Sequence, residues 1–271
     1  KAVDLMEQCY AHALTTGSTS VELYDAKTVA QRMVGMPLAL EERLGKLQTF
    51  LEARGLLGKD ELEALSHRLQ VTMRGLDMRS SRPNAILLLT GEARQNSEEM
   101  AHVIAEAVYG HPDRIIEIDF SRFHHPEDIN LLVGAPPGYV GYTDSLPLHR
   151  LAQTPWCVLR FENVDACHPY IRQVLLQAFK DGWLMDGRGR PMYLSDTIIL
   201  LTADILLETH RALGFFTEQE GVKVEDLEAA IQFAVGAELA SQIDLVLFGH
   251  RDPANISDTW LQDSLLKEIN T

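Results

Sequence analysis

The feature that most constrains the fold is a set of short apolar runs that alternate with helical segments through the middle of the chain. The runs are AILLLT, RIIEID, WCVLRF and TIILLT, at residues 85–90, 114–119, 156–161 and 197–202. Helical periodicity follows the first run as far as Tyr109, and a second helix is expected at residues 169–180, ending at Gly182. Apolar strands that alternate with helices predict an α/β fold with a parallel sheet covered on both faces.

Helices are also expected on either side of this region. Periodic apolar positions predict them at residues 1–14, 21–35, 41–54 and 60–74, and the pattern becomes helical again from about residue 226. In the first of these helices the apolar stripe consists of Val3, Met6, Tyr10 and Leu14. The length of 271 residues suits about two domains.

The composition excludes several classes of partner. A net charge of −15 disfavours nonspecific binding to nucleic acid or to an anionic membrane surface. No apolar run is long enough to span a bilayer. Three cysteines without a CxxC pair argue for a reducing compartment, so we expect a cytoplasmic or organelle-matrix protein. The chain begins at Lys1 and is expected to be a fragment.

One uncharged segment, GAPPGYVGY at residues 134–142, stands out among the loops. Proline fixes φ and glycine permits positive φ, so these residues predict a shaped loop. Its tip, Gly138-Tyr139-Val140-Gly141, would present an aromatic ring and a branched aliphatic side chain. The alternative is a tight turn whose tyrosines pack on the core.

The loop after the first strand is where an open parallel sheet binds ligands. It reads GEARQNSE at residues 91–98, whereas a phosphate-binding loop reads GxxxxGK[ST]. Asn96, Ser97 and Glu98 stand where glycine, lysine and a hydroxyl would be, and Arg94 alone faces the nearby carboxylates. Two like charges about 4 Å apart repel by roughly 4 kcal/mol at an effective dielectric of 20, so a triphosphate should be unwelcome. An ordinary helix capped by Asn96 or Ser97 explains the loop better.

Several long motifs carry a resemblance to a known family. These are KAVDLMEQC at the start, GAPPGYVGY, CHPYIRQVLLQAFKDGWLMDGRGR at residues 167–190, and ELASQIDLVLF at residues 238–248. Their order resembles the second AAA+ module of the Clp ring unfoldases, the ClpA, ClpB and ClpC group. The resemblance implies a P-loop-type, five-stranded parallel sheet flanked by helices. It divides the chain into the end of a preceding module with its linker (residues 1–40), a large α/β subdomain (41–235) and the start of a helical lid that the chain cuts short (236–271).

The resemblance also assigns positions around a nucleotide. Leu57 stands in the segment that contacts adenine, and Gly91 keeps the first glycine of the phosphate loop. Ser97 replaces the phosphate-binding lysine, and Glu98 replaces the threonine that holds Mg²⁺. These two changes remove the side chains that neutralise and orient the phosphates in the family.

The remaining family positions have changed as well. Glu162 takes the place of the metal-binding aspartate, and Asn163 that of the glutamate that activates water. Asp204 replaces the sensor asparagine, and Gln242 replaces the arginine finger that reaches a neighbouring subunit. An amide cannot act as a general base near neutral pH, and an arginine finger is typically worth a thousandfold or more. No cofactor is therefore expected from this module, and ATP with Mg²⁺ enters only if the degenerate site still binds it.

The family's pore loop matches Gly138–Gly141 letter for letter. The resemblance then implies a pseudo-ATPase module that keeps its substrate-threading loop, with ring subunits and unfolded polypeptide as partners. One alternative is a structural adaptor that regulates a ring without touching substrate. Another is a live ATPase in which Arg94 replaces the missing lysine, although it lies three residues before the lysine position.

Two smaller signals complete the reading. Leu213-Gly214-Phe215 is similar to a tripeptide that docks on the ClpP peptidase in ClpA and ClpC, and local packing of this loop is the alternative. The adjacent His124 and His125 lack further spaced ligands, so no metal site is expected. The charged residues between positions 181 and 190 predict a polar hairpin, which the resemblance places near a second pore loop.

Overall fold

A computed structural model describes residues 2–34, 40–77, 81–135, 146–152, 154–205 and 224–249. Its centre is a five-stranded sheet in the order β2-β3-β6-β1-β7, and every neighbouring pair is parallel. The strands are β1 (Ala85–Leu89), β2 (Ile115–Asp119), β3 (Val158–Glu162), β6 (Ile198–Thr202) and β7 (Leu245–Leu247). The predicted α/β fold with a five-stranded parallel sheet is confirmed, and the four predicted strands lie within two residues of their expected bounds.

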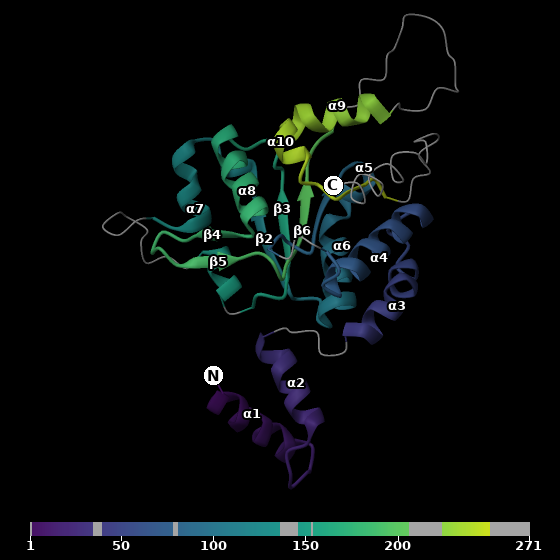
Figure 1. The fold of residues 1–271 in the computed structure, drawn as a ribbon, viewed down its shortest axis with the longest axis vertical. Helices are drawn as coiled ribbons and strands as arrows, with labels where there is room; N and C mark the ends of the chain where they lie inside the picture. Colours follow the sequence, from purple (N-terminus) through teal and green to yellow (C-terminus); the bar gives the residue numbers. More distant parts are fainter. Residues whose placement is uncertain are drawn as a thin grey trace, which may run out of the picture.

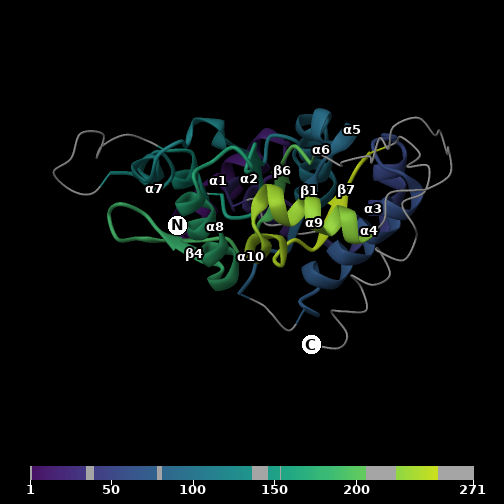
Figure 2. The same cartoon turned by 90° about the horizontal axis from the view of Figure 1, so that it is seen from above.

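Two apolar layers cover the sheet because successive side chains point to opposite faces. On one face Ile86, Leu88 and Phe161 pack with α8, α9 and α10. On the other face Leu87 and Leu89 pack with α3, α4 and α6. Figure 1 shows the two groups of helices on either side of the strands, and Figure 2 shows the same sandwich from above.

The helices agree in the main with the periodic segments. The long ones are α1 (Ala2–Thr15), α2 (Leu23–Val34), α3 (Leu40–Glu52), α4 (Lys59–Met73), α6 (Ser97–Ile104), α8 (Pro169–Asp181) and α9 (Val224–Val235). Shorter ones are α5 (Gly91–Gln95), α7 (Asn130–Val133) and α10 (Ala237–Ala240). A π-helical turn, η1 (Ala105–Tyr109), continues α6, and 3-10 turns occur at η2 (Phe120–Arg122), η3 (Pro126–Ile129) and η4 (Pro147–Ala152).

Local signals set the ends of α8. His168 caps its first turn by accepting the Tyr170 N–H, and Pro169 occupies the first position, where no N–H is needed. The helix ends at Gly182, which adopts φ 75. A side chain at Gly182 would overlap the backbone of Ser81, so both the conformation and the close approach require glycine here. The chain then enters a hairpin of β4 (Trp183–Met185) and β5 (Pro191–Tyr193), as predicted.

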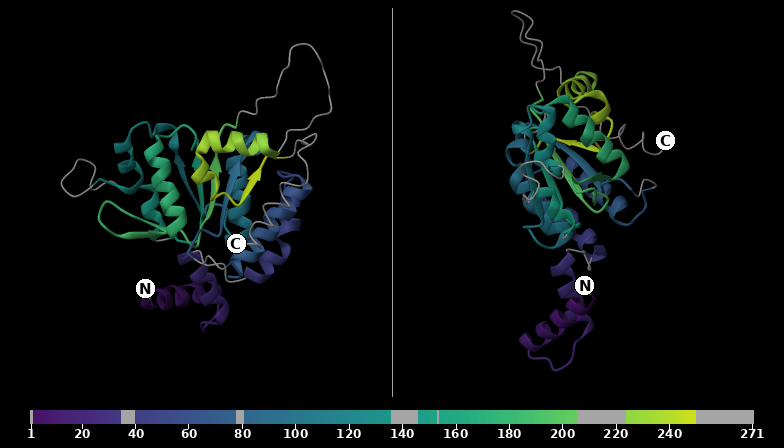
Figure 3. Two further views of the ribbon diagram at one scale, coloured as in Figure 1. Left: turned by 45° about the horizontal axis from the view of Figure 1, so that its top comes forward. Right: turned by 90° about the vertical axis from the view of Figure 1, so that its left-hand side faces the viewer.

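The first two helices form a separate pair. Figures 1 and 3 show α1 and α2 beyond the end of the sheet that lies opposite α9 and α10. The pair is joined by His12 Nδ1 and Asp25 Oδ1 at 2.7 Å. The backbone N–H of Glu22 and the His12 ring lower the pKa of Asp25. The predicted stripe on α1 is exposed, with Met6 at 73%, rather than packed on the α/β body.

Two further findings bear on function. No helix in the described parts of the chain is long and apolar enough to cross a membrane. All three cysteines are free and buried, and burial raises the pKa of the Cys157 thiol to about 12. The Cys157 thiol is therefore a protonated packing group rather than a nucleophile.

Candidate functional site

The segment after β1 is the short helix α5 rather than the open loop that the sequence predicted. Several backbone N–H groups of this segment are already bonded: that of Ala93 donates to the Phe248 carbonyl at 2.8 Å, and that of Arg94 donates to the Thr90 carbonyl at 3.2 Å. The Asn96 N–H donates to Glu92 at 3.1 Å. A phosphate-binding loop needs such groups free and pointing at the ligand. Carbonyl oxygens of the chain itself therefore occupy N–H groups that a phosphate would need.

Leu57 and Gly91, both expected near a nucleotide, are each in contact with neighbouring parts of the fold. Leu57 is buried in the same apolar layer as α4, next to Gly58 at the start of that helix. Gly91 adopts φ 55, and a Cβ built there would lie 3.3 Å from the Phe248 carbonyl oxygen. The segment after β7 is thus pressed against α5 at the position where the resemblance places the adenine and the phosphate loop.

Glu61 fixes this segment from the other side. Its carboxylate accepts the Phe248 N–H at 2.6 Å and the Gly58 N–H at 3.2 Å. Burial raises the pKa of Glu61 despite these hydrogen bonds. Gly249 follows with φ 96, and a Cβ there would lie 2.8 Å from the Ala93 nitrogen. These contacts hold Phe248 where its carbonyl can bond α5.

The predicted capping of α6 is wrong. Asn96 occupies the N-cap position but makes no side-chain cap bond. Ser97 is 3% exposed, and its hydroxyl accepts a hydrogen bond at 3.0 Å from the guanidinium of Arg160. The side chain at the phosphate-lysine position thus points into the protein and bonds to β3. Sequence reasoning did not anticipate this partner.

Arg160 is the central side chain of the site. It lies in the middle of β3 and is 8% exposed. Its guanidinium contacts Glu162 at 3.0 Å and Glu117 at 3.2 Å, and Glu117 is its direct cross-strand neighbour on β2. One cation therefore joins the phosphate-lysine position, Ser97, to the metal-ligand position, Glu162. The available signal was a lone arginine in an otherwise apolar strand.

Arg94 belongs to a second network rather than to the carboxylates around its own loop. Its guanidinium donates to the Asn163 amide oxygen at 3.1 Å and lies 3.6 Å from Asp204. The predicted base and sensor positions are thus brought together by this arginine. Arg94 does not lie beside Ser97, so the structure gives no support to its replacing the phosphate lysine.

Asn163 is held firmly in this network. It has φ 57, the only positive φ of a non-glycine residue among those described. Its backbone N–H donates to the Thr202 hydroxyl and its amide NH₂ to Asp119, both at 3.0 Å. Burial acts to raise the pKa of Asp119, but the hydrogen bonds from Asn163 and Ser121 outweigh it, and the net shift is downward. These bonds fix the orientation of the Asn163 amide.

Gln242 lies apart from the other predicted positions. It precedes β7, and its carbonyl accepts a hydrogen bond from Arg82, which precedes β1. Next to it, Asp244 forms a buried cluster with Arg68 and Arg82 and accepts the Ile86 N–H. Gln242 is therefore at the amino ends of the strands, away from Ser97, Glu162 and Asp204.

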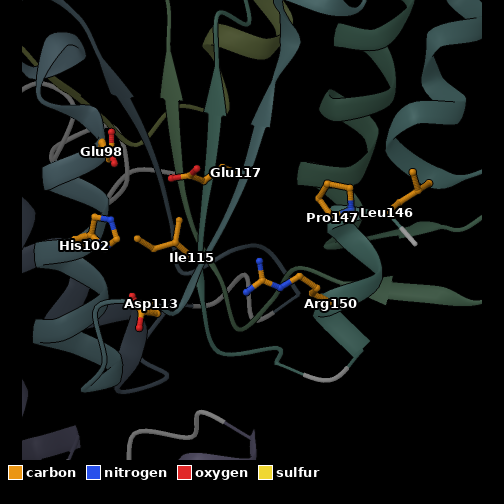
Figure 4. Close-up of a pocket in the computed structure, with 8 residues that line it drawn as sticks. All are labelled: Glu98, His102, Asp113, Ile115, Glu117, Leu146, Pro147 and Arg150. Atoms are coloured by element: carbon orange, nitrogen blue, oxygen red, sulfur yellow. The ribbon is translucent and has the colours of Figure 1, made fainter. Parts of the chain in front are cut away.

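An open cavity of about 600 Å³ adjoins the Arg160 cluster. It is lined by Glu98, His102, Asp113, Ile115, Glu117, Leu146, Pro147 and Arg150. Figure 4 shows Glu98 and His102 on one side and Arg150 on the other, with the Arg150 guanidinium pointing across towards Ile115 and Asp113. Three carboxylates face a single arginine here, so the cavity does not suit a triphosphate. Across the described residues, no group of three potential ligands could hold a metal ion.

The base of the predicted pore loop is described, although residues 136–145, including Gly138–Gly141, lie outside the described residues. Gly134 has φ 94, and Gly187 at the tip of the β4–β5 hairpin donates its N–H to the Val133 carbonyl at 2.7 Å. A Cβ built at Gly187 would lie 2.5 Å from the Gly134 carbonyl oxygen and 2.7 Å from that of Ala135. The hairpin is thus fitted against the base of the loop. Leu213, Gly214 and Phe215 also lie outside the described residues.

Comparison with known proteins agrees with this architecture. A family model described as AAA domain (Cdc48 subfamily) matches residues 82–246, which is more than half of the chain. The chain belongs to the AAA family. The ClpC ATP-binding subunits of the Clp proteases of Staphylococcus aureus (strain USA300) and Staphylococcus saprophyticus are each 28% identical to it, and each match covers 86% of this chain and 30% of the relative. This AAA chain therefore spans about a third of the length of those relatives.

Solved structures show the same fold. The S. cerevisiae Hsp104–ADP complex has a TM-score of 0.73 and 23% identity, covering 99% of this chain and 47% of the other. A closed-state reconstruction of Hsp104 with ATPγS and FITC-casein has a TM-score of 0.68 and 23% identity, covering 92% and 44%. The chain is therefore an AAA domain that is similar in sequence to part of the ClpC subunits and shares its fold with Hsp104.

Proposed function

We propose that this chain is a catalytically inactive AAA+ module of a Clp-type unfoldase that keeps its threading loop and acts within an oligomeric ring. The observation that carries the proposal is that the positions expected to hold a nucleotide are bonded to one another. Ser97 and Glu162 share Arg160, while Asn163 and Asp204 share Arg94. The residues present do not fit ATP and Mg²⁺, so we derive no hydrolytic step.

Electrostatics support the same conclusion. In a phosphoryl-transfer site, lysine, Mg²⁺ and arginine provide positive charge around the phosphates. Here the guanidinium of Arg160 is neutralised by Glu117 and Glu162, and that of Arg94 lies beside Asp204. Glu98 adds a negative charge at the start of α6, where an anionic ligand would otherwise gain from the helix dipole. A triphosphate would meet carboxylates in place of cations.

The threading role is the second half of the proposal. Gly138-Tyr139-Val140-Gly141 would grip an extended polypeptide in the axial channel of a ring. Gly134 and Ala135, which precede this segment, are fitted against the hairpin at Gly187, and this contact supports the proposal by fixing where the chain enters the segment. Sister AAA+ subunits and unfolded polypeptide are then the partners, and docking on a ClpP-like peptidase through Leu213-Gly214-Phe215 remains a proposal of the same kind. The division at residues 40 and 235 and the cytoplasmic or matrix location belong to the proposal as well.

A nucleotide titration tests the inactive site. The full chain is titrated with a fluorescent ATP analogue and Mg²⁺, and phosphate release is followed in the same samples. We expect neither binding at millimolar nucleotide nor turnover. Binding without turnover would make nucleotide a structural ligand, and turnover would refute the inactive assignment.

Replacement of Tyr139 tests the threading role. In the intact assembly, Tyr139→Ala should reduce the unfolding of a fluorescent model substrate at least tenfold, while Tyr139→Phe, which keeps the ring, should retain most of it. If Tyr139→Ala leaves unfolding unchanged, the chain is instead a structural or adaptor subunit that does not touch substrate.

A further inference from the structure

We propose that the Arg160 guanidinium is a built-in cation of the former nucleotide site, which joins α6, β2 and β3 in place of a bound ligand. The proposal rests on the inactive assignment above and concerns the same site. It explains how the module keeps one arrangement of these elements without nucleotide. The contacts that carry it are those of Arg160 with Ser97, Glu117 and Glu162.

The first argument is geometric. Nη1 of Arg160 lies 3.0 Å from the Ser97 hydroxyl and 3.0 Å from the Glu162 carboxylate, while Nη2 lies 3.2 Å from Glu117. A guanidinium presents five donors in a fixed planar fork and can contact three groups at once; an aliphatic side chain has no donors, and an ammonium lacks the planar fork. Ser97 begins α6, Glu117 lies on β2 and Glu162 ends β3. One side chain therefore ties three elements together.

The second argument is the cost of the arrangement. Arg160 occupies the middle of a strand in which Val158, Leu159 and Phe161 face apolar layers, and its Nε is buried without a hydrogen-bond partner among the described residues. Burying a charge this way is expensive, and a well-packed apolar side chain is often at least as stabilising. Hydrophobic packing alone therefore does not account for an arginine here. The arginine is accounted for if it links Ser97, Glu117 and Glu162, which would otherwise require an external ligand.

The third argument is charge. Without Arg160, Glu117 and Glu162 would share one face of the sheet with Glu98 nearby and no cation contacting all three elements in the described structure. Like charges at such distances repel. A site built in this way should accept a cation of the right shape once its own is removed. That property can be measured without any enzymatic activity.

The test is chemical rescue of Arg160→Ala in the full chain. The thermal midpoint of the variant should lie about 3 to 6 °C below that of the parent chain. Low millimolar guanidinium should recover at least half of this loss, because it fits the vacated space, whereas NaCl at equal ionic strength should not. The matched control is Arg150→Ala, an exposed arginine on the cavity rim, whose midpoint should respond to neither salt. An unchanged midpoint, or rescue no greater than with NaCl, would overturn the proposal.

A second variant keeps the proposal testable if Arg160→Ala does not fold. Glu162→Gln leaves Arg160 in place and removes one of its two carboxylate partners. We expect a lower midpoint than for Glu99→Gln, a neighbouring exposed glutamate on α6, and equal midpoints would overturn the proposal. Rescue together with nucleotide turnover by the parent chain would refute the inactive assignment alone. Absence of both rescue and turnover would refute the built-in cation alone.

Discussion

The predicted nucleotide site and the base of the predicted pore loop differ in how their polar groups are used. At the carboxyl ends of the strands, Arg160 and Arg94 bond to the positions that would otherwise contact a ligand. At the loop base, the contacts between Gly187 and Val133 only fix where the chain enters residues 136–145. The site resembles the family least in sequence and is bonded inward, whereas the loop matches the family fully. The proposed function accounts for this difference, because it assigns the module the task of positioning the loop rather than that of binding a nucleotide.

The largest expected effect is at the loop base. Gly187→Ala would place a Cβ within 2.8 Å of backbone atoms of Gly134 and Ala135, so the hairpin or the loop must move. We expect a loss of about 3 kcal/mol in the free energy of unfolding, since backbone atoms cannot rotate away. Urea unfolding of the chain measures it. The loss should be accompanied by reduced threading in the assembly, because the loop base is displaced.

The matched control for this change is Gly189→Ala in the same turn. Gly189 has φ 75 but nothing within 4 Å of a built Cβ, so the substitution adds backbone strain without a close approach. We expect a loss of about 1 kcal/mol. If the two variants lose equal stability, the hairpin is not fitted against the loop base. The difference between the loop base and the predicted nucleotide site would then be smaller than described above.

A smaller effect is expected at Asn163, in the network with Arg94 and Asp119. Asn163→Ala removes the bonds to Arg94 and Asp119 and places an alanine at φ 57. Together the lost hydrogen bonds and the backbone strain should cost about 2 kcal/mol. Asn163→Gly loses the same side-chain bonds but tolerates the backbone, and should cost about 1 kcal/mol. Urea unfolding of both variants separates the two terms. Equal losses would mean that the backbone conformation contributes nothing.

Much of the fold could be predicted from sequence because the deciding interactions are local. Short apolar runs predicted four strands. Pro169 and Gly182 marked the two ends of helix α8, which precedes the hairpin. The site could not be derived this way. A position-by-position comparison indicated which residues differ from the family, but it treated residues 91–98 as a loop and gave Asn96 or Ser97 as the cap of the following helix. The actual partner of Ser97 is Arg160, 63 positions away, and only the packing of α6 on β3 brings the two together.

Arg94 shows the same limit. In the sequence it stands among Glu92, Glu98 and Glu99, and charge counting pairs it with them. In the structure its direction is set by the helical turn α5, which carries the guanidinium to the ends of β3 and β6. The turn itself depends on the Phe248 carbonyl, which arrives from β7. Such an arrangement follows from tertiary packing and leaves no local pattern in the sequence.

The smallest expected effect is a pH dependence at Asp119, which would sharpen the assignment of the inward-bonded network. Its folded pKa is lowered from 3.8, so its stabilising contribution is present above that value and is lost as the pH falls through the folded pKa. Asp119→Asn should therefore be less stable than the parent chain at neutral pH, by less than about 1 kcal/mol because the side chain is 37% exposed. The difference between the two chains should shrink as the pH falls below 3.8, because the parent carboxylate becomes neutral as well.

Other acidic groups are common to both chains and cancel in this difference, which urea unfolding at several pH values measures. Glu127→Gln, an exposed glutamate on the adjoining η3 turn, should show no such convergence. A difference that stays constant with pH would mean that Asp119 acts through packing. The charge of Asp119 would then add nothing to the stability that its hydrogen bond with Asn163 provides.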